Sequence, residues 1–169
     1  LTGSQKFNNL ELIQTRGRTL TIASGTFATT TGTLTYGTYS NSSADRMTIN
    51  TGNIDAQGDI TVTNVSTILG GGTATITING TGAQVFTGPA TLNANPLARL
   101  PKITIDKPSG TLTLAGFITV AGNWTYVRGT VDATTNDSTV VTIANITFDG
   151  QGTSATMAFD NVTIHTNTV

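Results

Sequence analysis

The feature that most limits the fold of this chain is a series of very short runs in which apolar and polar residues alternate. In residues 110–133, Leu112 and Leu114 alternate with threonines, and the alternation resumes at Ile118 and again at Trp124. Each run is three to five residues long, and each break contains a glycine. A period of two is typical of β-strands with one buried side. Strands this short, without helical spacers, are typical of a β-sandwich or a β-solenoid.

The same alternation recurs along the chain, at residues 47–49, 60–62, 74–78 and 141–148. Threonine is the commonest residue, and there are 19 glycines. Threonine favours a pleated, half-buried surface, and glycine supplies the bends between short strands. Only 10% of the residues are charged, against roughly 25% in ordinary globular proteins. These observations predict an all-β protein.

Internal repetition favours the solenoid over the sandwich. The phrase at residues 7–12, FNNLEL, has similar versions at 100–105 and 159–164, and the phrase at 2–7 resembles that at 81–86. Repetition is typical of folds in which each coil covers the open edge of its neighbour. We therefore expect one solenoid domain over residues 1–169. It would contain one long repeat unit at about residues 7–100 and the start of further copies at about 100–169.

Three phrases resemble a known family. FNNLEL at residues 7–12, TGAQVF at 81–86 and GTLTLAGFITVAGNW at 110–124 resemble the degenerate repeats of bacterial extracellular, filamentous-adhesin-like surface proteins. Those proteins have right-handed parallel β-helix folds. The resemblance covers most of the chain and implies the same right-handed parallel fold, with an exported, scaffold-like or adhesive role. It carries no catalytic residue across.

Composition argues against several functional classes. The net charge is −1 and the basic residues are scattered, so we expect no binding of nucleic acid. No apolar run is long enough to span a bilayer. The absence of cysteine excludes disulfides, a thiol nucleophile and a cysteine metal site. The glycine-aspartate nonapeptide of calcium-binding β-rolls is missing as well. We expect no metal and no cofactor, and a location outside the cell or on its surface.

The candidates for catalysis are few. His165 is the only histidine and is expected on the polar side of its strand, which is a poor setting for a catalytic triad. Two pairs of acids, Asp55 with Asp59 and Asp132 with Asp137, are the candidates for glycoside or lyase chemistry, which needs two carboxyl groups held close together across a cleft. Both pairs are better interpreted as turn residues that bind their own backbone. We therefore expect that the chain is not an enzyme.

Aromatic residues and glycines have two interpretations each. Trp124 and Tyr126 lie in the apolar phase of their run and are expected in the core. Tyr36 and Tyr39 are ambiguous, because an exposed pair could stack on sugar rings. The glycine run at 70–72 is interpreted as a turn, since no phosphate-loop lysine follows it.

Seven Asn-X-Ser/Thr sequences are potential glycosylation sites if the protein is exported in a glycosylating source. Otherwise they are turn asparagines. They begin at Asn41, Asn64, Asn79, Asn123, Asn136, Asn145 and Asn161.

The function that these observations favour is a structural subunit or segment of an extracellular fibre or surface assembly. Both ends of the chain carry the same phrase and no cap, so open solenoid ends are expected to stack head to tail into a homopolymer. A fragment of a longer chain is the simpler interpretation of the same ends. An adhesin or carbohydrate-binding module is the alternative function, and a polysaccharide-active β-helix enzyme is a third.

Overall fold

The computed structural model describes residues 1–14, 19–38, 47–63, 70–90, 99–133, 138–142, 146–148, 155–158 and 162–166, with the backbone alone described from residue 141 onward. These residues contain sixteen β-strands and no helix. The strands are β1 (Gln5–Phe7), β2 (Leu10–Gln14), β3 (Thr19–Thr21), β4 (Phe27–Thr30), β5 (Leu34–Thr38), β6 (Thr48–Asn50), β7 (Asn53–Ala56), β8 (Ile60–Thr63), β9 (Thr75–Ile78), β10 (Gln84–Thr87), β11 (Lys102–Val120), β12 (Trp124–Asp132), β13 (Ser138–Thr142), β14 (Ile146–Phe148), β15 (Ala155–Ala158) and β16 (Val162–Thr166).

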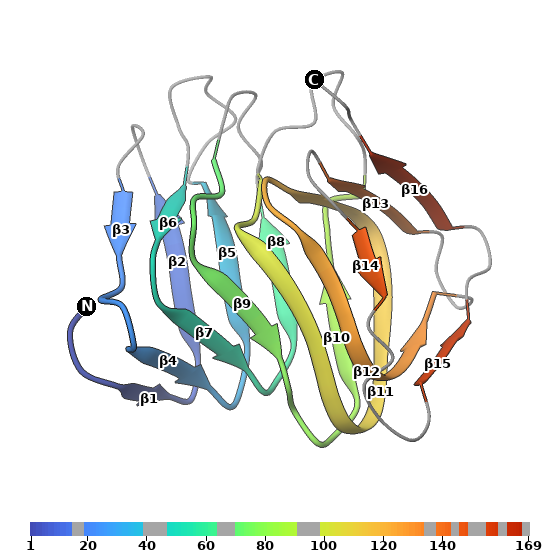
Figure 1. Ribbon diagram of the computed structural model, residues 1–169, viewed down its shortest axis with the longest axis horizontal. Helices are drawn as coiled ribbons and strands as arrows, with labels where there is room; N and C mark the ends of the chain where they lie inside the picture. Colours follow the sequence, from blue (N-terminus) through green and yellow to red (C-terminus); the bar gives the residue numbers. More distant parts are fainter. Residues whose placement is uncertain are drawn as a thin grey trace.

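The chain winds through three faces and returns to each of them. The first face pairs β1, β4, β7, β9, the start of β11, the start of β12 and β14. The second pairs β2, β5, β8, β10, the middle of β11, the end of β12 and β15. On the third face β3 pairs β6, and the end of β11 pairs β13 and then β16. Figure 1 shows the coils stacked along the long axis, from blue to red.

All strand pairs among the described residues are parallel, so the β-solenoid predicted from the sequence is confirmed. The alternative, a β-sandwich, is wrong because its sheets would be antiparallel. Paired positions on the first face lie between 21 residues apart, as in Ile103 with Trp124, and 27 residues apart, as in Thr75 with Lys102. One coil is therefore the structural repeat.

The core consists of rows of apolar residues that run from coil to coil. Because strands pair without a slip on the first face, an inward residue in one coil lies directly over an inward residue in the next. Trp124 is 3% exposed and Tyr126 is 2% exposed, which confirms their predicted place in the core. The ring of Trp124 stacks on Phe86, with centroids 6.3 Å apart. One such row is Ala28, Ile54, Ile76, Ile103 and Trp124.

The glycines in residues 110–133 were expected to break the strands, but they differ in whether a strand ends at them. The expected break at Gly116 is absent, because β11 continues through Gly110 and Gly116 to Val120. Both glycines have a positive φ, of 73° and 70°, and a Cβ on either would meet a carbonyl oxygen of the preceding coil at 2.3 to 2.5 Å. They turn the strand around the corners of the solenoid while the ladder continues. The step at Gly122 does end a strand.

The repeated phrases do not occupy equivalent places in the coils. Residues 10–12 belong to β2 on the second face, residues 103–105 to β11 on the first face, and residues 162–164 to β16 on the third face. A repeated sequence segment of this kind therefore indicates a short strand that follows a corner, and that strand can belong to any of the three faces. The long unit at about residues 7–100 stays a prediction about the sequence.

The position of a leucine along the stack should decide how much it stabilises the fold. Leu112→Ala, in a fully buried row of β11, is expected to lower the free energy of unfolding by about 2 to 5 kcal/mol. Leu12→Ala, in the partly covered first coil, should cost about 1 to 2 kcal/mol because less apolar surface is lost. Urea denaturation of the monomeric protein measures both changes, and equal losses would contradict an uncovered first coil.

Candidate functional site: the open first coil

Apolar side chains of the first coil are partly exposed, whereas the residues at the same positions of the second coil are buried. Its inward-facing residues Phe7, Leu10, Leu12 and Leu20 are partly buried and pack against the core. The residues paired with them one coil further on are completely buried: Thr30, Leu34, Tyr36 and Ile49, each at 0% exposure. Among the described residues, the first set has a neighbouring coil on one side, and the second set has neighbouring coils on both sides. The first coil is thus the end of a core, open on one side.

The backbone of the first coil is open in the same direction. In the described part of the chain, β1, β2 and β3 each pair with one strand only, namely β4, β5 and β6. Strand edges of this kind present N–H and C=O groups that can pair with another strand. Two further apolar side chains lie on this coil, Leu1 at 42% exposure and Ile13 at 38%. Apolar surface and hydrogen-bonding edge therefore coincide.

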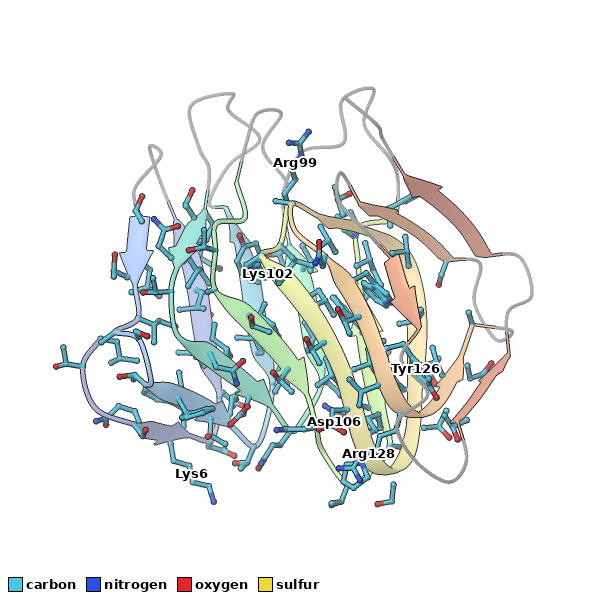
Figure 2. The ribbon with its side chains drawn as sticks, viewed as in Figure 1. Lys6, Arg99, Lys102, Asp106, Tyr126 and Arg128 are labelled. Carbon is cyan, nitrogen blue, oxygen red and sulfur yellow. The ribbon has the colours of Figure 1, made fainter. Side chains whose placement is uncertain are left out.

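Few charges surround this end among the described residues. Lys6 and Glu11 are exposed and lie at outward positions of β1 and β2, and Lys6 points away from the coils (Figure 2). The amino group of Leu1 donates a hydrogen bond to the Thr21 carbonyl oxygen at 2.7 Å. Because these charges are few and of both signs, they set up no strong repulsion against a second apolar surface.

At the other end, β14, β15 and β16 also pair on one side only within the described residues. Their backbones continue the three faces of the preceding coil, as the red strands in Figure 1 show. Both ends of the described solenoid are thus coils with one paired and one unpaired side.

Buried polar groups hold the corner between the first and second faces. The amide of Gln84 donates to the carbonyl oxygens of Ala56 and Gly58, in the coil before it. Lys107, which is 1% exposed, donates in turn to Gly80 O at 2.8 Å, Gly82 O at 2.9 Å and Gln84 Oε1 at 2.6 Å. Each side chain therefore supplies hydrogen-bond donors to the corner carbonyl oxygens of the coil before it. Burial lowers the pKa of the Lys107 ammonium.

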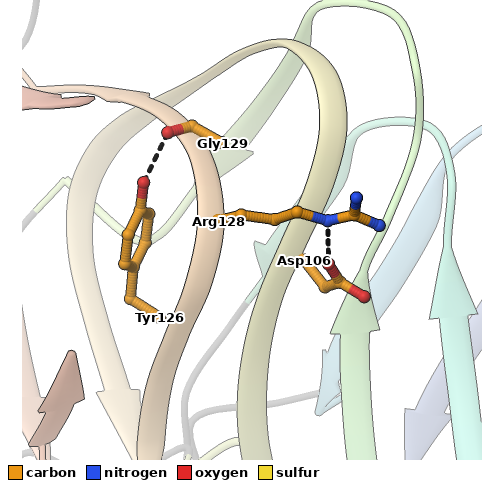
Figure 3. A network of polar contacts seen from close by, with 4 residues as sticks. All are labelled: Asp106, Tyr126, Arg128 and Gly129. Atoms are coloured by element: carbon orange, nitrogen blue, oxygen red, sulfur yellow. Dashed lines mark hydrogen bonds and ion pairs between the residues drawn. The ribbon is translucent and has the colours of Figure 1, made fainter. Parts of the chain in front are cut away.

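The next coil closes the same corner with an exposed ion pair and a hydrogen bond from the core residue Tyr126 (Figure 3). Arg128 Nε donates to Asp106 Oδ1 at 2.5 Å, between paired positions of β12 and β11. The Tyr126 hydroxyl donates to the Gly129 carbonyl oxygen. An exposed ion pair of this kind contributes about 0.2 to 1 kcal/mol. The sequence prediction did not include this corner, although Lys107 and Gln84 are polar residues at inward positions of β11 and β10, where the alternation calls for apolar ones.

Tyr36 is not the exposed sugar platform that the sequence left open. It is 0% exposed, and its hydroxyl donates to the carbonyl oxygens of Met47 at 2.9 Å and Arg99 at 3.0 Å. Burial raises its pKa. Tyr36 lies two residues after Leu34, so both side chains point to the inner side of β5. From there the hydroxyl reaches carbonyl oxygens near the third face. Tyr39, its predicted partner, lies outside the described residues.

The acid pairs are not arranged as predicted. Asp55 is a strand residue of β7, paired with Thr29 and Thr77, and not a turn residue. Burial raises its pKa, while hydrogen bonds from Asn53 and Asn79 oppose that rise. Asp59 lies between β7 and β8, and it accepts a hydrogen bond at 2.8 Å from the Val85 backbone N–H of the next coil, whereas a bond to its own turn was predicted. Asp55 thus lies on the first face, and Asp59 lies at the corner between the first and second faces.

The remaining acids and the histidine have limited descriptions. Asp132 ends β12 on the second face, and its predicted partner Asp137 lies outside the described residues. His165 is paired with Val141 in the backbone of β16, and its side chain lies outside the description. Within the described ranges, no three His, Asp or Glu side chains come together as a metal site.

The glycine run at 70–72 is not a free turn. Gly71 forms a parallel bridge with Thr48, and the φ angles of Gly71 and Gly72 are 96° and 97°. A Cβ on Gly71 would meet the Ala121 Cβ at 2.3 Å, and one on Gly72 would meet Ile49 O at 2.2 Å. The run is glycine because the third face passes there between two coils without room for side chains.

Two of the seven Asn-X-Ser/Thr sequences begin within the described residues. Asn79 follows β9 and Asn123 precedes β12, and both side chains are partly buried. The Oδ1 atom of Asn79 is buried without a hydrogen-bond partner. The others lie outside the described ranges; they begin at Asn41, Asn64, Asn136, Asn145 and Asn161.

Comparison with known proteins gives no family assignment: no protein-family model, no curated protein and no solved structure matches the chain. In the part of the chain that the structure describes, no helix is long and apolar enough to cross a membrane.

The buried ammonium of Lys107 predicts a dependence of stability on pH. Its pKa in the folded protein lies below the ordinary value of 10.5, so between the two values the unfolded chain binds more protons. The free energy of unfolding should therefore rise with pH in the interval below 10.5. Lys107→Met should lack this rise.

The measurement is urea denaturation of both proteins from pH 8 to just below 10. Higher pH is avoided because the raised pKa of Tyr36 acts in the opposite direction once free tyrosine ionises near pH 10. Parallel curves for the two proteins would show that Lys107 is not held in a desolvated site.

Proposed function

We propose that this protein is a structural subunit or segment of an extracellular fibre or surface assembly, and that it stacks head to tail through its open solenoid ends. One observation carries the proposal. The first coil continues inward rows of the interior coils with Phe7, Leu10, Leu12 and Leu20 and has the same strand edges, but no further coil of the described residues covers it.

The last coil of a second copy supplies the matching shape. It presents three parallel strands in the same order of faces, and its unpaired side faces away from the core of its own copy. A contact between the last coil of one copy and the first coil of the next is heterologous, so it continues into a filament and does not close into a dimer. Burial of the first-coil side chains would provide the driving force.

The composition supports a location outside the cell. The chain has no cysteine, few charges and many threonines, asparagines and glycines, as in the exported surface proteins that its repeats resemble. A side wall poor in charged residues also suits an extended, repetitive scaffold. Catalysis has less support, because the candidate acid Asp55 is a strand residue of β7, and Asp59 in the following corner binds the Val85 backbone N–H.

Electron microscopy of the purified chain tests this function. We expect unbranched fibres of uniform width, and we expect Leu12→Asp to abolish them, because a carboxylate would be buried at the joint. Thr104→Asp, which adds the same charge at an outward position of β11 between Thr77 and Thr125, should leave the fibres intact. A parent protein that remains a monodisperse monomer across a wide concentration range would contradict the proposal.

A carbohydrate-binding module is a second candidate, and one observation favours it. Phe27 is 45% exposed on the first face and is paired with Asn53, whose amide donates to Asp55 Oδ1 at 2.5 Å. Thr77 Oγ1 donates to Asn53 Oδ1 at 2.9 Å. An exposed ring beside ordered amide and carboxylate groups is a surface on which a sugar could stack and form hydrogen bonds.

This second candidate predicts that Phe27→Ala weakens glycan binding at least tenfold in a glycan array or calorimetric titration, because the stacking surface is lost. Val85→Ala, which removes an exposed apolar side chain from the second face, is the matched control and should leave binding unchanged. Absence of glycan binding by the parent protein would reject the candidate.

A further inference from the structure

We propose that the joint between two copies has one fixed register on the first face. In it, β14 of one copy pairs in parallel with β1 of the next, so that Ile146 lies opposite Gln5, Thr147 opposite Lys6 and Phe148 opposite Phe7. This inference rests on the head-to-tail assembly proposed above and goes further, because it names the residues that meet.

The register follows from rows that cross the described solenoid without a slip on this face. The outward row that begins at Lys6 passes through paired positions of every coil and ends at Thr147: Lys6, Thr29, Asp55, Thr77, Thr104, Thr125 and Thr147. The inward row on one side of it runs from Gln5 to Ile146, and the one on the other side from Phe7 to Phe148. The register shifts between β11 and β12 occur only after Ile105, beyond this face.

Because β1 and β14 occupy the same rows, adding a copy repeats the step that already joins each coil to the next. A slip by one residue would place the inward row containing Phe7 opposite an outward row. A slip by two residues would leave a single pair, since both strands are three residues long. The in-register joint is therefore the arrangement that covers Phe7 and keeps all three pairs.

The outward pair at the joint is also compatible in charge. Lys6 is exposed and would lie opposite the uncharged Thr147, so no like charges meet across the joint. The amine can remain in water while its stem lies along the edge of the neighbouring copy.

The absence of cysteine from the chain permits a direct test by disulfide cross-linking. The probe is the double variant Lys6→Cys/Thr147→Cys. Neighbouring strands lie about 4.8 Å apart, within the range of about 4.4 to 6.8 Å between Cα atoms that a disulfide spans. After assembly and mild oxidation, non-reducing gel electrophoresis should show a ladder of covalent oligomers that collapses on reduction.

Three controls locate the contact. Lys6→Cys/Thr125→Cys uses the same row one coil further in, where β14 already covers the strand, and should give no ladder. Ser4→Cys/Thr147→Cys reports a slip by two residues and should also give none. Lys6→Cys alone should give no dimers, whereas dimers would show that two first coils meet each other.

The outcomes separate this inference from the function on which it rests. Fibres that cross-link through Ser4→Cys/Thr147→Cys, or that form without any ladder from Lys6→Cys/Thr147→Cys, would overturn the register and leave head-to-tail assembly standing. If neither the parent protein nor any variant assembles, both proposals fail.

Discussion

The structure depends on a parallel hydrogen-bonded ladder in which every coil completes the one before it. A coil alone has strands of three to five residues over most of its length and no second layer. Its edges and its inward side chains are satisfied only by neighbouring coils, in the manner of other solenoids. The ladder is what buries Ile76 and Ile103 completely, and its end is what leaves Phe7 and Leu12 partly uncovered. The stability of the fold and the head-to-tail assembly that we propose therefore have a single origin.

The same ladder restricts what can stand at the corners. Carbonyl oxygens at a tight corner point along the stack, where water has no access, so a side chain of the next coil has to supply the donor. Lys107 and Gln84 do so between the first and second faces. The buried Tyr36 hydroxyl donates to Met47 in its own coil and to Arg99 in a later one. These polar groups are buried for a structural reason. The burial of Lys107 and Tyr36 is explained by the backbone carbonyls to which they donate.

Much of the fold could be predicted from the sequence, because alternation in β11 and β12 reports directly on burial. Trp124, Leu112 and Leu114 are where the pattern predicts. The places of Asp55 and Tyr36 were harder to predict. Asp55 is in a strand of only four residues beside a turn. The burial of Tyr36 depends on an acceptor, Arg99, that lies 63 residues away in the sequence. Lys107 breaks the apolar inward phase of β11, but its role could not be predicted because its partners Gly80 and Gly82 lie 25 to 27 residues earlier. The open first coil was predicted only in outline, from the lack of a cap.

The central claim is that the ladder continues from one copy into the next, and X-ray diffraction from aligned fibres tests it most directly. The first face has seven strands in succession among the described residues, from β1 to β14, and rungs are spaced by about 4.8 Å. We predict a strong meridional reflection near 4.8 Å and an axial repeat of about 34 Å, the rise of those rungs when no gap interrupts the stack. Fibres without the meridional reflection, or with a repeat that includes a gap between copies, would contradict a continuous ladder.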